Sequence, residues 1–450
     1  MSESRLVKIN EPPCLRDQSV ELEINFRKTL HKLGITPFSR FVIGVSGGTD
    51  SMALAGLISN FSYSAKINSI AVIVDHGLRP ESGAQAIDSK KELERLKLKT
   101  KIVKISEKQP SGNIQHWARN QRYRILLSEA RMHGGVLMIA HHQDDQIETL
   151  YLRLKHDSGL LGLAGMKVQR FHHAVRIIRP LLEQKKLELY SYCTFNNIRT
   201  VEDPTNTNLK YDRVRARNHL KRDKLLGNQL LQVSSHVNKI VSVFKRHCAD
   251  WCQEHIHFEF PIYACFAIAE FNYLPELVRI YILQQMLWQI GAADYPARLN
   301  SVRAGIKKIK ARKKFTLAGC IVCPRGDIME IHAERKRFIS NPMLIIPHNP
   351  AVIDNRWLVK TNRPLNVNQM SDEFYQRAKK DKNLRYIMNK WRYPARLCIP
   401  ILQDLDGRVI RPHIEECDVN IDVSSGELIG TSPNKTTLVP IRKIPFWNEN

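Results

Sequence analysis

One short stretch near the N-terminus constrains the fold of this chain most: an apolar run that ends in a turn with two glycines and several hydroxyl groups. Residues 41–45, Phe-Val-Ile-Gly-Val, have the length and composition of a buried strand, and residues 52–58 have the pattern of a helix. The turn at 46–51 therefore precedes a helix, where backbone N–H groups lack partners and the macrodipole is positive. These properties predict a binding site for an oxyanion.

The residue types of the turn indicate that this anion is a phosphate group. Gly47 and Gly48 have no Cβ and let the backbone approach a phosphate, and hydroxyl donors come from Ser46, Thr49 and Ser51. A Walker-type loop would need a Gly-Lys dipeptide, and the sequence contains none. A phosphate loop without that lysine indicates a different use of the nucleotide, in which pyrophosphate leaves and attack occurs at the α-phosphate.

The segments that follow predict a parallel sheet with helices on both faces. Apolar runs with the length of buried strands lie at 70–74, 101–105 and 136–140. A helical pattern at 114–132 separates the last two runs. Ligands of such sheets bind beyond the carboxyl ends of the strands. We therefore expect the turns that follow three of the strands to converge, at 46–51, 75–76 and 141–142.

A cluster of imidazole and acidic side chains follows the run at 136–140. His141 and His142 precede three carboxylates, Asp144, Asp145 and Glu148. Asp144 and Glu148 are four residues apart, so on a helix both carboxylates lie on one face. Acidic residues in the first turn of a helix are also common as capping residues. The density of the cluster favours a general base or a cation-binding site, because neighbouring carboxylates repel each other and raise a pKa.

The charge of the chain indicates a large anionic partner. The 450 residues include 69 Lys and Arg against 44 Asp and Glu, which gives a net charge of +25. Such an excess is typical of proteins that bind nucleic acid or an anionic membrane, although a generally basic proteome would also produce it. We expect no membrane segment, because no run of about 18 uncharged apolar residues is present.

The cysteines and the N-terminal composition point to a reducing compartment. Nine cysteines, an odd number, are scattered along the chain, and no secretory signal pattern is visible at the N-terminus. We expect a cytoplasmic protein without a disulfide framework. Cys320 and Cys323 have the spacing of a metal-binding knuckle, but the Ile-Val between them favours a strand in a core.

Several basic segments are candidates for contact with RNA. Arginines occupy alternate positions at Arg213, Arg215 and Arg217, and residues 301–314 contain seven cations and no acid. Residues 376–396 mix eight Lys and Arg with aromatic side chains, a combination that suits phosphate contact and base stacking. A solvated basic face, or buried aromatics in a small domain, would explain the same patterns.

Length and pattern together predict three domains. We expect an α/β domain at 1–222, with a Rossmann-like parallel sheet and helices on both faces, because a chain of 450 residues exceeds one core. A mainly helical module is expected at 223–341, with residues 225–291 helical and a strand-like pattern from Phe315. A small α+β domain is expected at 350–450, after a proline-bounded linker.

The turn at 46–51 resembles the Ser-Gly-Gly-x-Asp-Ser signature of PP-loop ATP pyrophosphatases. Further motifs resemble the tRNA(Ile)-lysidine synthetase family, in the family's order, and lie at 75–79, 118–123, 141–149, 159–166, 179–182 and 202–206. One departure is visible, because His156-Asp157 stands where the family has Arg-Gly. The replacement puts any phosphate or RNA contact at that point in question.

The resemblance implies an enzyme that acts on the wobble cytidine, C34, of an isoleucine tRNA with a CAU anticodon. ATP adenylates C2 of the base, pyrophosphate leaves, and the ε-amine of free L-lysine displaces AMP to give lysidine. The implied partners are ATP, Mg²⁺, L-lysine and this tRNA, and a homodimer is possible.

The resemblance also assigns candidate roles to residues. The ATP site would comprise Ser46, Gly47, Gly48, Thr49, Asp50, Ser51, His141 and Arg119. Asp50 is also a candidate Mg²⁺ ligand. Lysine must lose a proton from an amine of pKa near 10.4, so Asp144, Asp145 and Glu148 are the candidate catalytic groups. The candidate RNA contacts are Arg122, Arg213, Arg215, Arg217, Lys313, Lys314 and Arg392.

Three other functions remain open on the sequence. A related tRNA thiolase would activate cytidine in the same way, but it typically uses a Cys-x-x-Cys pair, and no cysteine lies between Cys14 and Cys193. An amidase-type ligase of small molecules would leave the net charge of +25 unexplained. A basic RNA-binding protein with a vestigial nucleotide loop would not need the turn at 46–51 together with Asp144 and Glu148.

Overall fold

The computed structural model divides the chain into two compact units, one with the described residues up to Asn238 and one with those from Lys239 onward. The described residues are 15–36, 39–62, 69–78, 80–107, 109–112, 114–156, 158–172, 175–201, 212–259, 262–293, 295–334, 343–346, 351–353, 356–380, 398–406, 409–410, 413–414 and 437–440. None of the helices in these ranges has the length and apolar character needed to cross a membrane.

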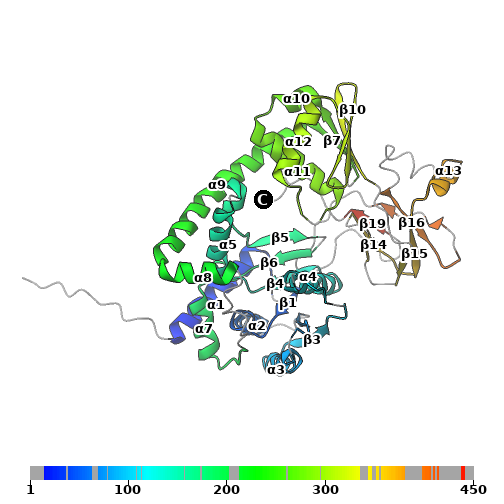
Figure 1. Cartoon of the computed structure of the whole chain (residues 1–450). Helices are drawn as coiled ribbons and strands as arrows, with labels where there is room; N and C mark the ends of the chain where they lie inside the picture. Colours follow the sequence, from blue (N-terminus) through cyan, green and yellow to red (C-terminus); the bar gives the residue numbers. More distant parts are fainter. Residues whose placement is uncertain are drawn as a thin grey trace, which may run out of the picture. The chain divides into compact units, whose positions relative to one another are not determined.

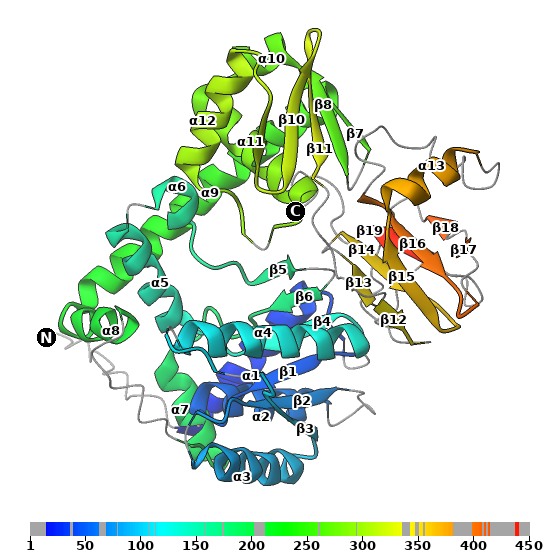
Figure 2. The same cartoon turned by 45° about the vertical axis from the view of Figure 1, so that its right-hand side comes forward.

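The first unit is built on a six-stranded sheet with the order β3-β2-β1-β4-β6-β5 (Figures 1 and 2). Its strands are β1 (Val42–Val45), β2 (Ile70–Asp75), β3 (Lys99–Lys104), β4 (Val136–Ile139), β5 (Gln169–His172) and β6 (Val175–Ile178). All neighbours pair in parallel except β5, which runs antiparallel to β6. The predicted parallel sheet is therefore confirmed, with one antiparallel edge strand.

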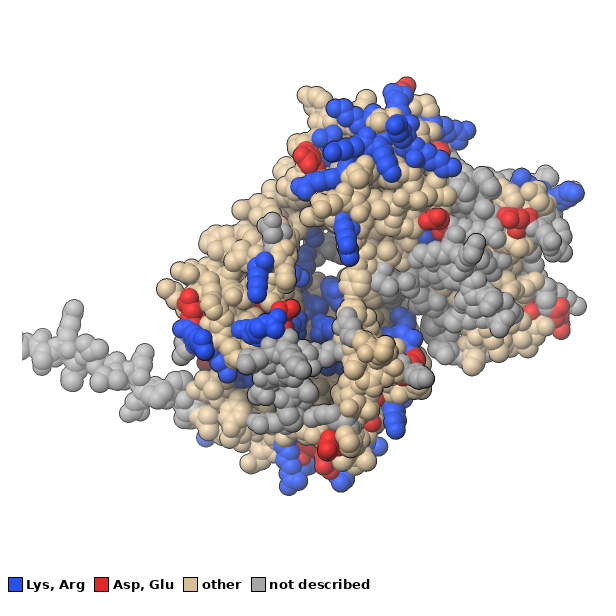
Figure 3. Space-filling view, in the orientation of Figure 1, with Lys and Arg blue, Asp and Glu red and all other residues tan. Residues whose placement is uncertain are grey.

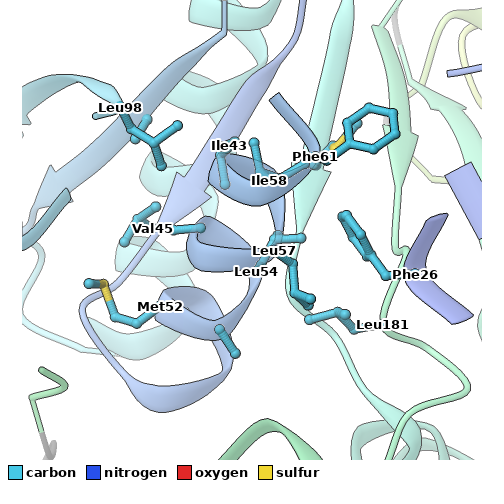
Figure 4. Close-up of a cluster of buried hydrophobic side chains, with 14 of the residues drawn as sticks. Phe26, Ile43, Val45, Met52, Leu54, Leu57, Ile58, Phe61, Leu98 and Leu181 are labelled. Atoms are coloured by element: carbon cyan, nitrogen blue, oxygen red, sulfur yellow. The ribbon is translucent and has the colours of Figure 1, made fainter. Parts of the chain in front are cut away.

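Helices cover both faces of this sheet, as the continuous apolar strands predict. One face packs against α4 (Ile114–Met132), where Val42 of β1 belongs to the same buried cluster as Leu126 of the helix. The other face is covered by α1 (Leu15–Lys32), α2 (Thr49–Ser62), α3 (Ser82–Arg95) and α7 (Lys186–Phe195). Figure 4 shows Ile43 and Val45, which alternate with Val42 along β1, packed against α2.

The strand order places the functional turns together. β1 lies between β2 and β4, so the chain moves outward in one direction from β1 to β3 and then returns to the other side at β4. The carboxyl ends of β1 and β4 flank this topological switch point, where ligands bind in open parallel sheets. The turn after β1 leads into α2, and the turn after β4 leads into α5 (Gln143–Lys155).

The glycine-rich segment after α5 is docked against that helix. Gln146 donates to the Met166 carbonyl at 3.0 Å and accepts from the Met166 N–H at 2.7 Å. Arg153 donates to the carbonyls of Gly162 and Gly165 at 2.8 and 2.9 Å. Gly165 has a φ of +73°, and a Cβ there would lie 2.6 Å from the Gln146 amide, so this close approach needs a glycine. The segment contains α6 (Gly159–Leu163).

Two further helices of the first unit follow the sheet. α8 (Asp212–Arg222) packs against α5, and the long helix α9 (Lys224–His255) begins in this unit. Leu225 to Gly291 were expected to be helical, and this is wrong for residues 256–259 and 263–267, which form two strands in the second unit. Short apolar runs such as Tyr263–Ala267 fit a buried strand or a buried helix equally well.

The second unit contains a five-stranded antiparallel sheet with the order β7-β8-β11-β10-β9. Its strands are β7 (Ile256–Glu259), β8 (Tyr263–Ala267), β9 (Phe315–Leu317), β10 (Cys320–Arg325) and β11 (Ile328–Ala333). They are joined by α10 (Ile268–Tyr273), α11 (Glu276–Gly291) and α12 (Leu299–Lys310). The strand-like pattern expected from Phe315 is confirmed.

The rest of the second unit has two four-stranded sheets and one described helix, α13 (Asp372–Lys380). One sheet has β12 (Met343–Ile345), β15 (Leu365–Gln369), β16 (Pro400–Gln403) and β17 (Val409–Ile410). The other has β13 (Ala351–Ile353), β14 (Trp357–Lys360), β18 (His413–Ile414) and β19 (Thr437–Pro440). The α+β composition expected for the C-terminal region is confirmed by these sheets and α13. The boundaries of the three expected domains stay predictions.

Candidate functional site

The turn after β1 is closed by its own serines. Ser51 Oγ donates to the Gly48 carbonyl at 2.9 Å and accepts from the Ser46 N–H at 3.1 Å. The two hydroxyl oxygens of Ser46 and Ser51 are 3.1 Å apart. Because the Ser51 hydroxyl donates its proton to the Gly48 carbonyl, the Ser46 hydroxyl is the donor in the bond between the two hydroxyl groups. The turn is thereby held in shape at the first residues of α2, as an anion site requires.

Gly47 fixes the path of this turn. Its φ is +83°, and a Cβ there would lie 2.4 Å from Ser89 Oγ of α3. A Cβ on Gly48 would meet nothing closer than 3.7 Å. The Gly47 carbonyl accepts a hydrogen bond from the Val201 N–H at 2.9 Å. Gly47 is therefore required by the fold, whereas Gly48 leaves open backbone at the predicted phosphate position.

His142 joins the turn after β1 to the turn after β4. Its Nε2 lies 3.4 Å from Asp50 Oδ2 and 3.6 Å from Asp145 Oδ2, and its backbone N–H donates to Asp145 Oδ2 at 3.2 Å. The side chain is 2% exposed. The predicted convergence of these two turns is confirmed by this contact. The third turn, at Asp75, is held by its own hydrogen bonds from Gly77 and Ser82.

The charges around His142 shift both partners toward their ionised forms. Burial alone would lower the pKa of His142, but the hydrogen bond to Asp50 and the charges of Asp145, Asp50 and Asp144 outweigh it and raise the pKa. Burial would likewise raise the pKa of Asp50, but His142, Lys186 and Arg217 together lower it. The pair is therefore more ionic at neutral pH than the free side chains would be.

Glu148 forms a second ion pair one turn further along α5. Arg217 Nε of α8 donates to Glu148 Oε1 at 2.6 Å, and the Glu148 side chain is 3% exposed. Burial raises the pKa of Glu148, and Arg217 offsets this only in part. Burial opposes the charge of Arg217, but Glu148, Asp145 and Asp50 outweigh it and raise the pKa of Arg217. The negative charges of Glu148, Asp145 and Asp50 therefore all stabilise the positive charge of the Arg217 guanidinium.

Several polar atoms of this region are buried without a hydrogen-bond partner. Among the residues that the structure describes, nothing bonds to Asp50 Oδ1, Glu148 Oε2, His142 Nδ1 or Thr149 Oγ1. A buried carboxylate oxygen without a donor costs free energy of about 1–3 kcal/mol or more. Such atoms indicate a ligand. Asp50 Oδ1 fits Mg²⁺, which prefers oxygen ligands, and Glu148 Oε2 fits an ammonium group.

His141 lies in the opposite electrostatic environment. Arg179 Nε, just after β6, donates to His141 Nδ1 at 3.2 Å. Burial lowers the pKa of His141 well below its usual value, and the charges of Arg179, Arg119, Arg213 and Arg122 lower it further. A neutral imidazole that accepts at Nδ1 carries its proton on Nε2. His141 is therefore a neutral hydrogen-bond donor.

The predicted site residues fall into distinct groups. Asp50 of the turn at 46–51, Asp145 and Glu148 lie together around His142 and Arg217. Asp144 Oδ1 approaches the backbone N–H of Lys186, at the start of α7, at 3.5 Å. Arg119 and Arg122 lie near His141 on α4. Arg217 donates to Glu148, and its predicted contact with RNA stays a prediction.

The other predicted RNA contacts lie on surfaces or outside the described residues. Arg213 is exposed near His141, and Arg215 is exposed and paired with Asp212. Lys313 and Lys314 are exposed in the second unit, directly after α12. Figure 3 shows Lys and Arg side chains gathered over α12. Arg392 lies outside the residues that the structure describes, as does most of the basic segment at 376–396.

Arg179 and Lys186 are site residues to which the sequence analysis assigned no role, although Arg179 begins the motif at 179–182. Arg179 is only 5% exposed and directly follows the apolar strand β6. A buried arginine at the carboxyl end of such a strand was a usable signal, because charged residues are rarely buried without a partner. Lys186 carried no comparable signal, since its position depends on how α7 packs.

A glycine-paired phosphate turn at the switch point of a parallel sheet defines the class of PP-loop proteins. A family model described as a PP-loop domain matches residues 18–224. Relatives named tRNA(Ile)-lysidine synthase extend the similarity further. The one from Wolbachia sp. subsp. Brugia malayi (strain TRS) is 30% identical over 350 residues, 75% of this chain and 80% of the relative. The one from Orientia tsutsugamushi (strain Boryong) is 27% identical over 422 residues, 88% and 94% of the two chains. The chain belongs to the tRNA(Ile)-lysidine synthase family.

Proposed function

We propose that this protein ligates L-lysine to C2 of the wobble cytidine, C34, of tRNA(Ile) with a CAU anticodon, using ATP and forming lysidine. Family membership supports the reaction. The observation that carries it in this chain is the 3.4 Å contact between His142 and Asp50, because it brings the predicted phosphate turn and a group of carboxylates to one sheet edge. A ligase that activates a base with ATP and then attacks it with an amine needs both.

The turn at 46–51 would bind the phosphates that leave as pyrophosphate. Its backbone N–H groups at the start of α2 would donate to the anion. Asp50 Oδ1 is the oxygen that would hold Mg²⁺, which would neutralise charge on the leaving pyrophosphate. His141 Nε2 and Arg119 would donate hydrogen bonds to the α-phosphate. The charges of Arg179, Arg213 and Arg122 nearby would stabilise its negative charge.

Glu148 and Asp145 would bind and deprotonate the attacking lysine. Glu148 Oε2 is buried and has no donor among the described residues, so an ε-ammonium would supply the missing hydrogen bond. The raised pKa of Glu148 makes this carboxylate a better proton acceptor near neutral pH than an exposed glutamate. Asp144 would contribute negative charge nearby, since its charge acts on His142.

The half-buried Arg122 and the exposed cations would hold the tRNA. Arg122 and Arg213 surround His141 at the site, and Lys313 and Lys314 belong to the exposed basic surface after α12 in the second unit. Arg215 is a further candidate on α8, and Arg392 remains one on sequence alone. Each such contact neutralises a phosphate and makes binding weaker as salt concentration rises. A homodimer stays possible and is tested by light scattering.

The test is nucleoside mass analysis of tRNA after incubation with the protein, ATP, Mg²⁺ and lysine. We expect a lysine adduct on cytidine in the CAU tRNA, none in a tRNA with another anticodon, and none when lysine is omitted. A sulfur mass shift with a sulfur donor would redirect the proposal to a thiolase. Absence of pyrophosphate release with all substrates present would contradict it.

A further inference from the structure

The five-stranded sheet of the second unit has one apolar face and one face with metal-binding side chains. Val322 of β10 and Met329 and Ile331 of β11 are fully buried, on the face that packs against α11. Because side chains alternate along a strand, Cys323 and Glu330 lie on the other face, where they are direct cross-strand partners. His332, two residues after Glu330, shares that face.

Three potential ligand atoms meet there. Cys323 Sγ, a carboxylate oxygen of Glu330 and a ring nitrogen of His332 all lie within 4.8 Å of one another. His332 Nε2 and Glu330 Oε2 are 3.1 Å apart. We propose that Cys323, Glu330 and His332 bind a zinc ion. This site is independent of the proposed ligase reaction.

The geometry suits zinc with only a small adjustment. Zinc takes cysteine, histidine and carboxylate ligands in a tetrahedron, with bonds of about 2.0–2.3 Å. Ligand atoms then lie roughly 3.3 Å apart, which the Glu330 and His332 pair already satisfies. Cys323 Sγ lies within 4.8 Å of the other two ligand atoms, and we expect rotation of its side chain to bring it to this spacing. A thiolate in the set selects zinc over Mg²⁺ or Ca²⁺, which prefer oxygen ligands.

The surroundings orient the carboxylate and leave a way in. Tyr263 of β8 donates its hydroxyl to Glu330 Oε1 at 3.1 Å, which leaves Oε2 facing His332. His332 is 1% exposed and Glu330 is 6% exposed, whereas Cys323 is half-buried and marks the entry side. Arg325 Nη1, on an exposed side chain, lies 3.7 Å from Glu330 Oε1 and competes with the ion for this charge.

The proposed ligand set differs from the pattern visible in the sequence. Cys320 and Cys323 are three residues apart on a strand, so they point to opposite faces of β10. Cys320 Sγ donates to the Leu287 carbonyl of α11 at 3.5 Å. The two cysteines therefore cannot bind one ion as a knuckle. The zinc would instead join β10 to β11 and stabilise the sheet.

The experiment uses the full chain without an affinity tag, in a reductant that does not bind metal. Cobalt(II) titration reports a cysteine ligand through a thiolate charge-transfer band in the near ultraviolet, and elemental analysis after zinc loading and dialysis gives the stoichiometry. We expect one zinc per chain, the cobalt band, and a higher Tm with zinc. Cys323→Ser should abolish the band and weaken zinc binding at least tenfold.

Matched variants separate loss of the site from loss of the fold. Cys320→Ala changes a cysteine on the other face of the same strand and should keep both the band and the zinc. Arg325→Ala removes the competing charge and should tighten zinc binding. The proposal is overturned if the wild-type chain shows no cobalt band, or if Cys323→Ser retains it while circular dichroism confirms the fold.

Discussion

His141 and His142 are neighbours in the sequence, but they belong to opposite electrostatic halves of the site. His142 faces Asp50 and Asp145, and these carboxylates raise its pKa. His141 accepts from Arg179, and burial together with four arginine charges lowers its pKa well below the usual value. The same residue type is thus charged more readily on one side and kept neutral on the other.

The backbone at the end of β4 makes this division possible. His142 has extended backbone angles, with φ of −123° and ψ of −177°. Successive side chains of an extended segment point to opposite sides. The end of β4 therefore places His141 in an arginine-lined half of the site, which suits a phosphate group. It places His142 in a carboxylate-lined half, which suits Mg²⁺ and an ammonium group.

The largest expected effect comes from removing Glu148, the proposed general base of the carboxylate-lined half. Glu148→Gln should lower lysine incorporation by about 10²–10⁴-fold, the usual contribution of a general base, and should leave single-turnover pyrophosphate release nearly unchanged. Asp144→Asn should cost less, because Asp144 is more exposed and Oδ1 lies near the Lys186 N–H. Rapid-quench assays of both half-reactions measure the difference.

The exposed carboxylate of Glu183, close to the start of α5, provides the control. Its backbone carbonyl accepts from Gln143, so Glu183→Gln changes the charge near the helix without touching the ion pair of Glu148 and Arg217. If Glu148→Gln lowers pyrophosphate release and lysine incorporation equally, Glu148 does not act specifically in the attack by lysine.

The next effect concerns the phosphate turn. Gly47→Ala forces a side chain onto a left-handed φ and toward Ser89, at a backbone cost of about 1–3 kcal/mol. Both the Tm and pyrophosphate release should fall, the latter by roughly 5–150-fold. Gly48→Ala has room for its Cβ, so it should keep the Tm and lose only nucleotide affinity. Calorimetry with and without ATP distinguishes the two, and equal Tm values would contradict this account of Gly47.

A smaller effect is expected in the arginine half. Arg179→Gln removes the donor that keeps the proton of His141 on Nε2, and should slow pyrophosphate release about tenfold. It also removes a positive charge and should raise the pKa of His141. The rate of the variant should then recover as pH falls, because protonated His141 again donates from Nε2. A variant rate that keeps the wild-type pH profile would refute the tautomer assignment.

The smallest effect is a change in the pH dependence of stability. The folded pKa of His142 is raised, so its contribution is present below the unfolded pKa and lost as pH rises through the folded pKa. His142→Gln should cost about 1 kcal/mol in mildly acid solution and progressively less as the pH rises through the folded pKa, as measured by urea unfolding. A difference that grows as pH rises would have the wrong sign.

The sheet and the convergence of the two turns could be predicted because they depend on local pattern. The turn at 46–51 directly follows the buried strand β1, and the acidic cluster directly follows the buried strand β4. In a parallel sheet the carboxyl ends of such strands lie at one edge. The partners of these residues could not be predicted in the same way. Arg217 reaches Glu148 from a separate helix, and Arg179 reaches His141 from the end of β6.

The second unit shows a different kind of failure. Residues 256–259 and 263–267 carry apolar residues that fit either secondary structure. Only the pairing of β7 with β8, and of β8 with β11, makes them strands. The Ile-Val between Cys320 and Cys323 correctly indicated a strand, but the grouping of Cys323 with Glu330 depends on register between β10 and β11. Register of this kind is set by tertiary packing.

The most direct test of the divided site is an NMR titration of the imidazole rings in the full chain, with ¹⁵N-labelled histidine. His141→Gln and His142→Gln assign the two sets of signals. We predict that His142 titrates above pH 6.5, while His141 stays neutral down to acid pH with its proton on Nε2. If both rings titrate near pH 6.5, or if their order is reversed, the site is not divided in this way.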